Sequence, residues 1–141
     1  MGSAAPLLRL AWWVAAVGGP ALSKAAMPVL ILIAEDDPII REILAQLLID
    51  EGYRVSVAAD GQEALDYAIL YSPDLIVSDI KMPRLHGLAL VERLRAGGNP
   101  VPVVLISTWT PPNALPGVRF FRKPFDLDAI IEAVELSLAV G

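Results

Sequence analysis

From Met27 onwards, short apolar runs alternate with longer stretches whose apolar residues recur at helical spacing. The short runs predict buried strands, and the longer stretches predict helices. Strands that alternate with helices are typical of an α/β domain with a doubly wound parallel sheet. The expected strands are residues 29–34, 54–58, 75–78, 103–106 and 118–121.

Residues with known capping preferences mark the ends of the expected helices. Asp37 suits an N-cap and Pro38 a first helical position, and Gly52 suits the end of the same helix. A turn at residues 60–61 precedes the second helix. The first expected helix begins at residue 38, and the other three span residues 62–71, 85–96 and 127–140. The helix at residues 62–71 is expected to bury Ala64, Leu65, Ala68 and Ile69.

The stretch between Ser107 and Lys123 is short and rich in residues that break helices. It reads TWTPPNALPGVRFFR, and Pro111, Pro112 and Pro116 leave room for no more than a turn before the fifth strand. A helix between the fourth and fifth strands is therefore expected to be absent or reduced to an irregular loop.

The composition is that of one acidic domain without thiol chemistry. The chain has 141 residues, a formal net charge of −5 and no cysteine. An acidic surface argues against nucleic acid or an anionic membrane as a direct partner. The lack of cysteine excludes a disulfide framework and fits a reducing compartment, so a cytoplasmic location is expected.

The first 26 residues differ in pattern from the rest of the chain. Their apolar stretch, residues 10–17, is too short to span a bilayer, and a charged start typical of a signal peptide is nearly absent. We expect residues 1–26 to be a disordered leader or an over-extended start, and residues 27–141 to be the folded domain. A signal peptide, or a membrane-surface anchor through Trp12 and Trp13, is the alternative.

Charged and polar residues stand where the expected strands end. Glu35 and Asp36 follow the first strand, Asp79 the third, Ser107 the fourth and Lys123 the fifth. The carboxyl ends of parallel strands meet at one crevice. Carboxylates that lie this close need a counter-charge, and Mg²⁺ suits one or two carboxylates with water and a phosphate. Lys123 would add positive charge and Ser107 a hydroxyl, so the set fits a tetrahedral anion on Asp79.

Each of these residues also has a simpler structural role open to it. Asp36 and Asp79 could cap a helix or a turn, Ser107 could be an ordinary strand-end hydroxyl, and Lys123 could be solvated. It is improbable that all of these simpler roles coincide at the ends of four different strands, which favours a functional site.

The sequence resembles the receiver domain of two-component response regulators. The resemblance covers residues 27–141 and is carried by the motifs ILIAEDDPIIREIL, PDLIVSDIKMPRLHGLALVERLR, PVVLIS and FFRKPF. It implies a CheY-like, flavodoxin-like fold whose five parallel strands have the order 2-1-3-4-5. The short stretch before Lys123 departs from the family, which normally has its fourth helix there.

The resemblance also implies roles for the residues at the strand ends. Asp79 would be the phosphoacceptor, and Lys123 the lysine that pairs with the phosphoryl group. Glu35, Asp36 and Asp79 would bind Mg²⁺ together with the backbone carbonyl of Lys81.

Further roles concern the switch that would follow phosphorylation. Ser107 is implied as the switch hydroxyl and Phe120 as the switch aromatic, and Pro124 is expected to follow a cis peptide bond. His86, the lone histidine, is expected to be a solvated loop side chain.

The implied function is that of a single-domain response regulator. A sensor histidine kinase or a histidine phosphotransfer protein would donate the phosphoryl group, and the modified domain would switch conformation to control a partner protein. A phosphate sink or an intermediate in a phosphorelay is a variant of this role. The protein is not expected to be a conventional enzyme, but it would catalyse its own phosphorylation and dephosphorylation at Asp79.

Other classes of protein fit the sequence less well. A pseudo-receiver, which would be an interaction module that is not phosphorylated, is favoured only by the lost helix. A metal-dependent phosphatase with an aspartyl nucleophile is disfavoured, because Lys81 stands where a second acid would be needed as the general acid.

Overall fold

The computed structural model describes residues 28–109 and 115–140. Within these residues, five parallel strands form one sheet in the order β2-β1-β3-β4-β5, which confirms the predicted topology. The strands are β1 (Leu30–Ala34), β2 (Arg54–Ala58), β3 (Leu75–Asp79), β4 (Val103–Ser107) and β5 (Val118–Arg122).

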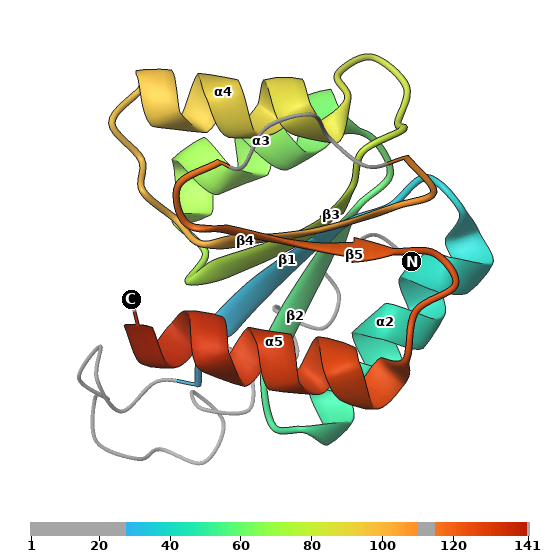
Figure 1. Ribbon diagram of the computed structural model, residues 1–141. Coiled ribbons are helices and arrows are strands. Elements are labelled where there is room, and N and C mark those ends of the chain that lie inside the picture. Colours follow the sequence, from blue (N-terminus) through green and yellow to red (C-terminus); the bar gives the residue numbers. More distant parts are fainter. Residues whose placement is uncertain (1–27, 110–114, 141) are drawn as a thin grey trace, which may run out of the picture.

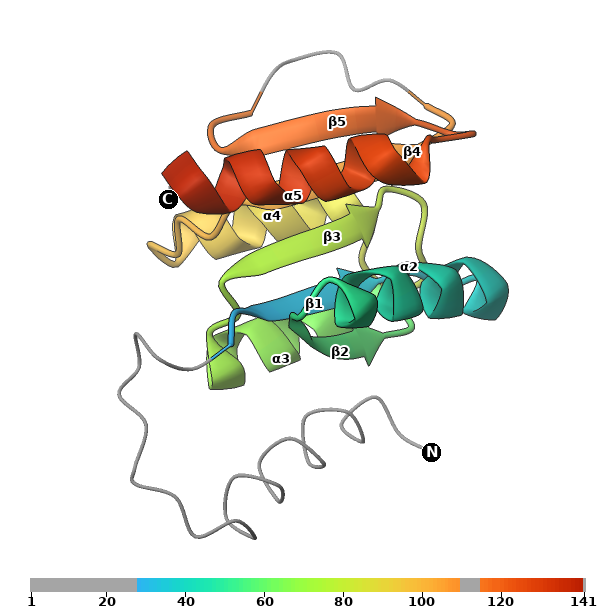
Figure 2. The same ribbon diagram turned by 90° about the horizontal axis from the view of Figure 1, so that it is seen from below.

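Two helices cover each face of the sheet (Figures 1 and 2). α2 (Pro38–Asp50) and α5 (Leu127–Val140) pack on one face, and α3 (Gly61–Tyr71) and α4 (Gly87–Ala96) pack on the other. This three-layer arrangement leaves the two ends of the strands uncovered by helices, and these ends hold the features described below.

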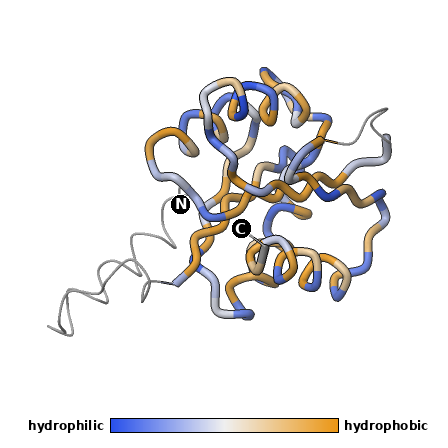
Figure 3. Tube along the Cα trace, turned by 60° about the vertical axis from the view of Figure 1, so that its left-hand side comes forward, coloured by the Kyte–Doolittle hydropathy of each residue, from blue (hydrophilic) through white to orange (hydrophobic). Residues whose placement is uncertain are grey.

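Strand β1 shows why the strands read as continuous apolar runs. Side chains alternate between the faces of a strand, so that Ile31 and Ile33 pack against α2 and α5. Leu32 and Ala34 pack toward α3 and α4. All five residues of β1 are buried. Figure 3 shows the resulting hydrophobic band through the middle of the molecule.

The first helix begins as its sequence predicts. The carboxylate of Asp37 accepts hydrogen bonds from the backbone N–H groups of Ile39 (2.9 Å) and Ile40 (3.4 Å), and Pro38 occupies the first helical position. Gly52 follows the helix with a φ of +96°, a conformation that glycine adopts at little cost.

Two details of the predicted helices are wrong. Ile69 was expected to be buried but is 66% exposed. Ile69 comes four residues after Leu65, which is more than one helical turn of 3.6 residues. Its side chain is therefore rotated away from that of Leu65 and lies outside the buried face of the helix. The helix expected at residues 85–96 begins at Gly87, because His86 has an extended backbone and serves as its N-cap.

The helix that we expected to be lost is the one after β4. The helix labelled α4 precedes β4 and corresponds to the helix predicted at residues 85–96. Of the connection between β4 and β5, the structure describes residues 108–109 and 115–117, and none of these is helical. The rest of the predicted loop, residues 110–114, lies outside the described residues, as does the predicted leader.

A cavity of about 570 Å³ lies at the amino ends of the strands. Its lining includes Val29, just before β1, and Leu138, near the end of α5. β5, which precedes α5, is parallel to β1, and α5 runs back along the sheet. The end of α5 therefore lies at the same edge of the sheet as the start of β1. Among the described residues, no helix is long and apolar enough to cross a membrane.

Candidate functional site

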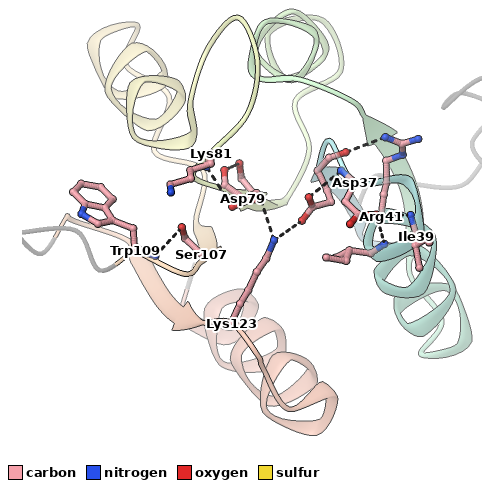
Figure 4. A network of polar contacts seen from close by, with 11 residues as sticks. Asp37, Ile39, Arg41, Asp79, Lys81, Ser107, Trp109 and Lys123 are labelled. Carbon is pink, nitrogen blue, oxygen red and sulfur yellow. Dashed lines mark hydrogen bonds and ion pairs between the residues drawn. The ribbon is translucent and has the colours of Figure 1, made fainter.

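The predicted site residues gather at the carboxyl edge of the sheet. Asp79 and Ser107 are the last residues of β3 and β4, Glu35 and Asp36 directly follow β1, and Lys123 directly follows β5. Because the strands are parallel, their carboxyl ends lie side by side, and the structure brings Asp79, Glu35 and Lys123 into direct contact (Figure 4).

Lys123 supplies the positive charge of this cluster. Its Nζ lies 3.0 Å from Oδ2 of Asp79 and 3.4 Å from Oε1 of Glu35. Burial alone would lower the pKa of the Lys123 ammonium, but the hydrogen bond to Asp79 and the charge of Glu35 outweigh burial and raise this pKa. The backbone N–H of Lys123 donates to the carbonyl of Ser107, and the peptide bond to Pro124 is cis, as predicted.

Glu35 is the most deeply buried carboxylate of the site, with 1% of its surface exposed. Burial raises the pKa of Glu35 to about 7, and the nearby charge of Asp79 also raises it. A hydrogen bond from the backbone N–H of Asp37 to Oε2 (3.1 Å) and the charge of Lys123 oppose this increase. The cluster therefore holds more negative charge than one lysine compensates.

The acidic residues fit a divalent cation. Glu35, Asp36 and Asp79 each offer a carboxylate oxygen, and these oxygens lie within 4.8 Å of one another. An all-oxygen donor set with excess negative charge is the kind that Mg²⁺ prefers. Glu35, Asp36 and Asp79 therefore form a set of residues that could hold Mg²⁺.

Lys81 lies close to Asp79, in the loop that leaves β3. Its backbone N–H points to Oδ1 of Asp79 at 3.3 Å (Figure 4). The two carboxylate oxygens of Asp79 thus have different neighbours, the Lys81 amide at Oδ1 and the Lys123 ammonium at Oδ2. The Mg²⁺-binding role of the Lys81 carbonyl stays a prediction.

Ser107 is 1% exposed and bonds to the segment that follows it. Its hydroxyl oxygen accepts a hydrogen bond from the backbone N–H of Trp109 at 3.1 Å. Because the hydroxyl is an acceptor in this bond, its own hydrogen can be donated elsewhere. Sequence reasoning placed Ser107 at the site but did not foresee that its hydroxyl is tied to Trp109.

Phe120 lies in β5, where it pairs with Leu105 of β4. It is partly buried against the core on the side of α3 and α4. Phe120 therefore contacts the core on that face of the sheet. Its role as a switch aromatic stays a prediction.

Sequence reasoning also missed how the loop after Asp79 is held. His86 caps α4 by accepting, at Nδ1, a hydrogen bond from the backbone N–H of Ala89 (3.2 Å), although its side chain is exposed as expected. Arg84 of the same loop forms an ion pair with Asp60. Histidine is not among the residues preferred at N-caps, and the ion pair joins distant segments, so the sequence held no clear signal for either contact.

Comparisons with known proteins agree with the fold. The family model of the response regulator receiver domain matches residues 31–135. The chain is 37% identical to the transcriptional regulatory protein PdtaR of Mycobacterium tuberculosis over 124 residues, which are 83% of this chain and 60% of PdtaR. It is 31% identical to the transcriptional regulatory protein DltR of Streptococcus agalactiae over 75% of this chain and 50% of DltR. The chain thus spans about half to 60% of the length of these relatives.

Solved structures give the same assignment. The receiver domain of the Francisella response regulator 1452 superposes with a TM-score of 0.73 at 29% identity, over 80% of this chain and 98% of that domain. The chemotaxis protein CheY4 of Vibrio cholerae superposes with a TM-score of 0.72 at 29% identity, over 79% of this chain and all of CheY4. This chain belongs to the response regulator receiver domain family of two-component signalling.

Proposed function

We propose that this receiver domain accepts a phosphoryl group on Asp79 from a phosphohistidine and switches conformation to control a partner protein. The observation that carries the proposal is the position of the Asp79 carboxylate. It lies against the ammonium of Lys123 and within reach of the acidic pair Glu35 and Asp36. A carboxylate placed among these groups is suited to act as a nucleophile toward a phosphoryl group.

The transfer needs little covalent help from the protein. An oxygen of the Asp79 carboxylate would bond to phosphorus while the N–P bond of the phosphohistidine breaks, and the bonding electron pair would stay on the imidazole nitrogen. Glu35, Asp36 and Asp79 would hold Mg²⁺, which when bound neutralises charge on the transferred group. Lys123, already within 3.0 Å of Asp79, would pair with a phosphoryl oxygen.

Ser107 would report the modification to the rest of the domain. Its hydroxyl can donate to a phosphoryl oxygen on Asp79 while it accepts from the backbone of Trp109. A shift of the hydroxyl toward the phosphoryl group would therefore act on the connection between β4 and β5. A local contact change of this kind can bias the neighbouring segment between two conformations, as phosphorylation switches commonly do.

The surface beside the site suits the approach of a donor protein. Ile39, at the start of α2, is 70% exposed. Next to it, a cavity of about 410 Å³ is lined by Ile40, Thr108, Lys123, Pro124 and Phe125. An exposed apolar area at the rim of a charged site supports a protein donor, and receiver domains interact with histidine kinases.

Intact-mass spectrometry after incubation with Mg²⁺ and acetyl phosphate tests the proposal, with the isosteric variant Asp79→Asn as the control. We expect one added phosphoryl group that requires Mg²⁺ and is lost in the variant. A wild-type chain that gains no phosphoryl group, and also fails to bind beryllofluoride, would instead support an interaction module that is not phosphorylated.

A further inference from the structure

The loop from β3 to α4 packs against the start of α3, which belongs to another part of the chain. Asp60, the N-cap of α3, and Gly61, its first residue, both contact this loop. The carboxylate of Asp60 forms an ion pair with Arg84, with 3.1 Å between Oδ1 and Nη2. Gly61 packs directly on Leu85. The start of α3 is not part of the site, yet it contacts the loop that leaves Asp79.

The contact at Gly61 requires the absence of a side chain. A Cβ atom at this position would overlap the carbonyl oxygen of Leu85 and lie 2.6 Å from its carbonyl carbon. The obstacle is backbone, which cannot rotate away as the end of a flexible side chain can. Any larger residue at position 61 must therefore displace the loop or the start of α3.

The base of the same loop is closed just as tightly. The backbone N–H of Gly87 donates to the carbonyl of Ile80 (2.7 Å), and a Cβ at Gly87 would overlap the carbonyl oxygen of Asp79. Arg84, at the tip, has a φ of +66°, which is unusual for a residue with a side chain and persists when its surroundings hold it.

Asp60 is held ionised at the centre of this contact. Burial would raise the pKa of Asp60, but hydrogen bonds from the backbone N–H of Glu63 and from Arg84 outweigh burial and lower it. The Oδ1 atom accepts both bonds, at 2.8 Å and 3.1 Å. One carboxylate thus caps α3 and anchors the loop at the same time.

We propose that Asp60, Gly61 and Arg84 are positioning residues that hold the loop carrying Lys81 in register with the carboxylates of the site. Lys81 lies in this loop, and its backbone N–H already reaches Asp79. The inference rests on the proposed function, because it assigns these residues an effect on Mg²⁺ affinity and on phosphorylation. Groups that orient metal ligands from outside commonly change metal affinity when they are altered.

The competing explanation is that the core alone holds the loop. Ile80 and Leu85 are both buried in the cluster beneath α3 and α4. If these two side chains suffice, the ion pair and the close contact at Gly61 would contribute only to the stability of the fold.

The variant Arg84→Asn separates the two explanations. Asparagine tolerates a positive φ, so the variant removes the guanidinium without adding backbone strain. The control is Arg93→Asn, which makes the same charge change at an exposed position of α4. Calorimetric titration with Mg²⁺ gives the dissociation constant, and hydrogen exchange of the metal-free protein reports on the backbone amides of residues 80–82 and 84–87.

We expect Arg84→Asn to raise the Mg²⁺ dissociation constant about two- to fivefold, since partly exposed ion pairs contribute modestly. Gly61→Ala should raise it about tenfold, since it displaces the loop directly. In both variants, the backbone amides of the loop should exchange hydrogen faster than in wild type, at a temperature where each variant remains folded. The exchange rates and the Mg²⁺ dissociation constant of Arg93→Asn should match those of wild type. Arg84→Lys, which retains the charge, should recover part of the loss.

Two outcomes overturn the inference in distinguishable ways. If wild type binds Mg²⁺ and both variants bind it equally well, with unchanged exchange in the loop, the positioning role is wrong while the proposed function stands. If wild type neither binds Mg²⁺ nor gains a phosphoryl group, the proposed function is wrong, and the inference that rests on it is wrong as well.

Discussion

Lys123 and Asp79 form an ion pair of 3.0 Å between residues that lie 44 positions apart in the sequence. The pair joins the end of β5 to the end of β3 across the intervening strand β4. The ammonium thus occupies the same carboxylate cluster that would bind the cation. Two positive charges compete for one set of oxygens, and this competition gives the first prediction.

Lys123→Met should bind Mg²⁺ about three- to tenfold more tightly, because a nearby positive charge no longer opposes the cation. The same variant should accept a phosphoryl group from acetyl phosphate at least about tenfold more slowly, because charge on the transferred group is less well neutralised. Titration calorimetry and timed mass spectra measure the two effects. Arg122→Met, an exposed neighbour with the same charge change, is the control, and weaker Mg²⁺ binding by Lys123→Met would contradict the argument.

Glu35 should make the stability of the metal-free protein depend on pH. Its pKa of about 7 in the folded protein exceeds the ordinary glutamate value of 4.5, so the folded state binds more protons than the unfolded state between these pH values. The contribution of Glu35 to the free energy of unfolding is complete below about pH 4.5 and is lost as the pH rises through about 7. This contribution is on the order of 2 kcal/mol. Thermal unfolding with EDTA should therefore show a decrease between pH 5 and pH 8.

Glu35→Gln provides the matched control for this pH dependence. The amide cannot ionise, so the decrease from Glu35 should disappear and the variant should unfold at a higher temperature than wild type at pH 8 without metal. Added Mg²⁺ should stabilise wild type more than the variant. Identical pH profiles for the two proteins would contradict the shifted pKa.

Trp109 should report what happens at Ser107, because its backbone N–H donates to the hydroxyl. Beryllofluoride with Mg²⁺ should change the tryptophan emission of wild type, since Ser107 would turn toward the bound anion. Ser107→Ala removes the acceptor and should lose most of this change. Trp109→Phe measures the contribution of Trp12 and Trp13 to the emission. An unchanged emission response in Ser107→Ala would contradict the proposed coupling between Ser107 and Trp109.

Arg95 should stabilise the short connection before β5. Its guanidinium is partly buried, which lowers its pKa, and it donates to the carbonyls of Asn99 (3.0 Å) and Pro116 (3.1 Å). Arg95→Met retains the apolar stem but leaves both carbonyls without this donor. We expect a loss of about 1–2 kcal/mol in urea unfolding. Phosphorylation should be nearly unchanged, because these contacts lie at the edge of the sheet away from Asp79, and equal stability would remove the role.

The topology and the position of the site could be read from the sequence because they depend on local patterns. An apolar run that ends in a carboxylate, as at Asp79, signals both a buried strand and the end of that strand. Parallel pairing then places all such ends together, without knowledge of any single contact. The N-cap at Asp37 was predictable for the same reason, since its partners lie within three residues.

Contacts between distant segments left no trace in those patterns. Nothing near Arg84 indicates that its partner is Asp60, 24 residues earlier. The space needed at Gly61 also arises only when the loop after β3 is in place. Ile69 shows the converse error, because its apolar character suggested burial that the geometry of the helix does not provide.

The meeting of Val29 and Leu138 at one cavity has a practical consequence for how the protein can be handled. That cavity lies at the amino edge of the sheet, whereas Asp79 lies at the carboxyl edge, and a five-residue strand is about 17 Å long. A linker placed directly before Val29 or after Leu138 would therefore leave the sheet on the side away from Asp79. A domain immobilised on a sensor surface through either point should present its acidic crevice to the solution, open to a phosphodonor in the flow.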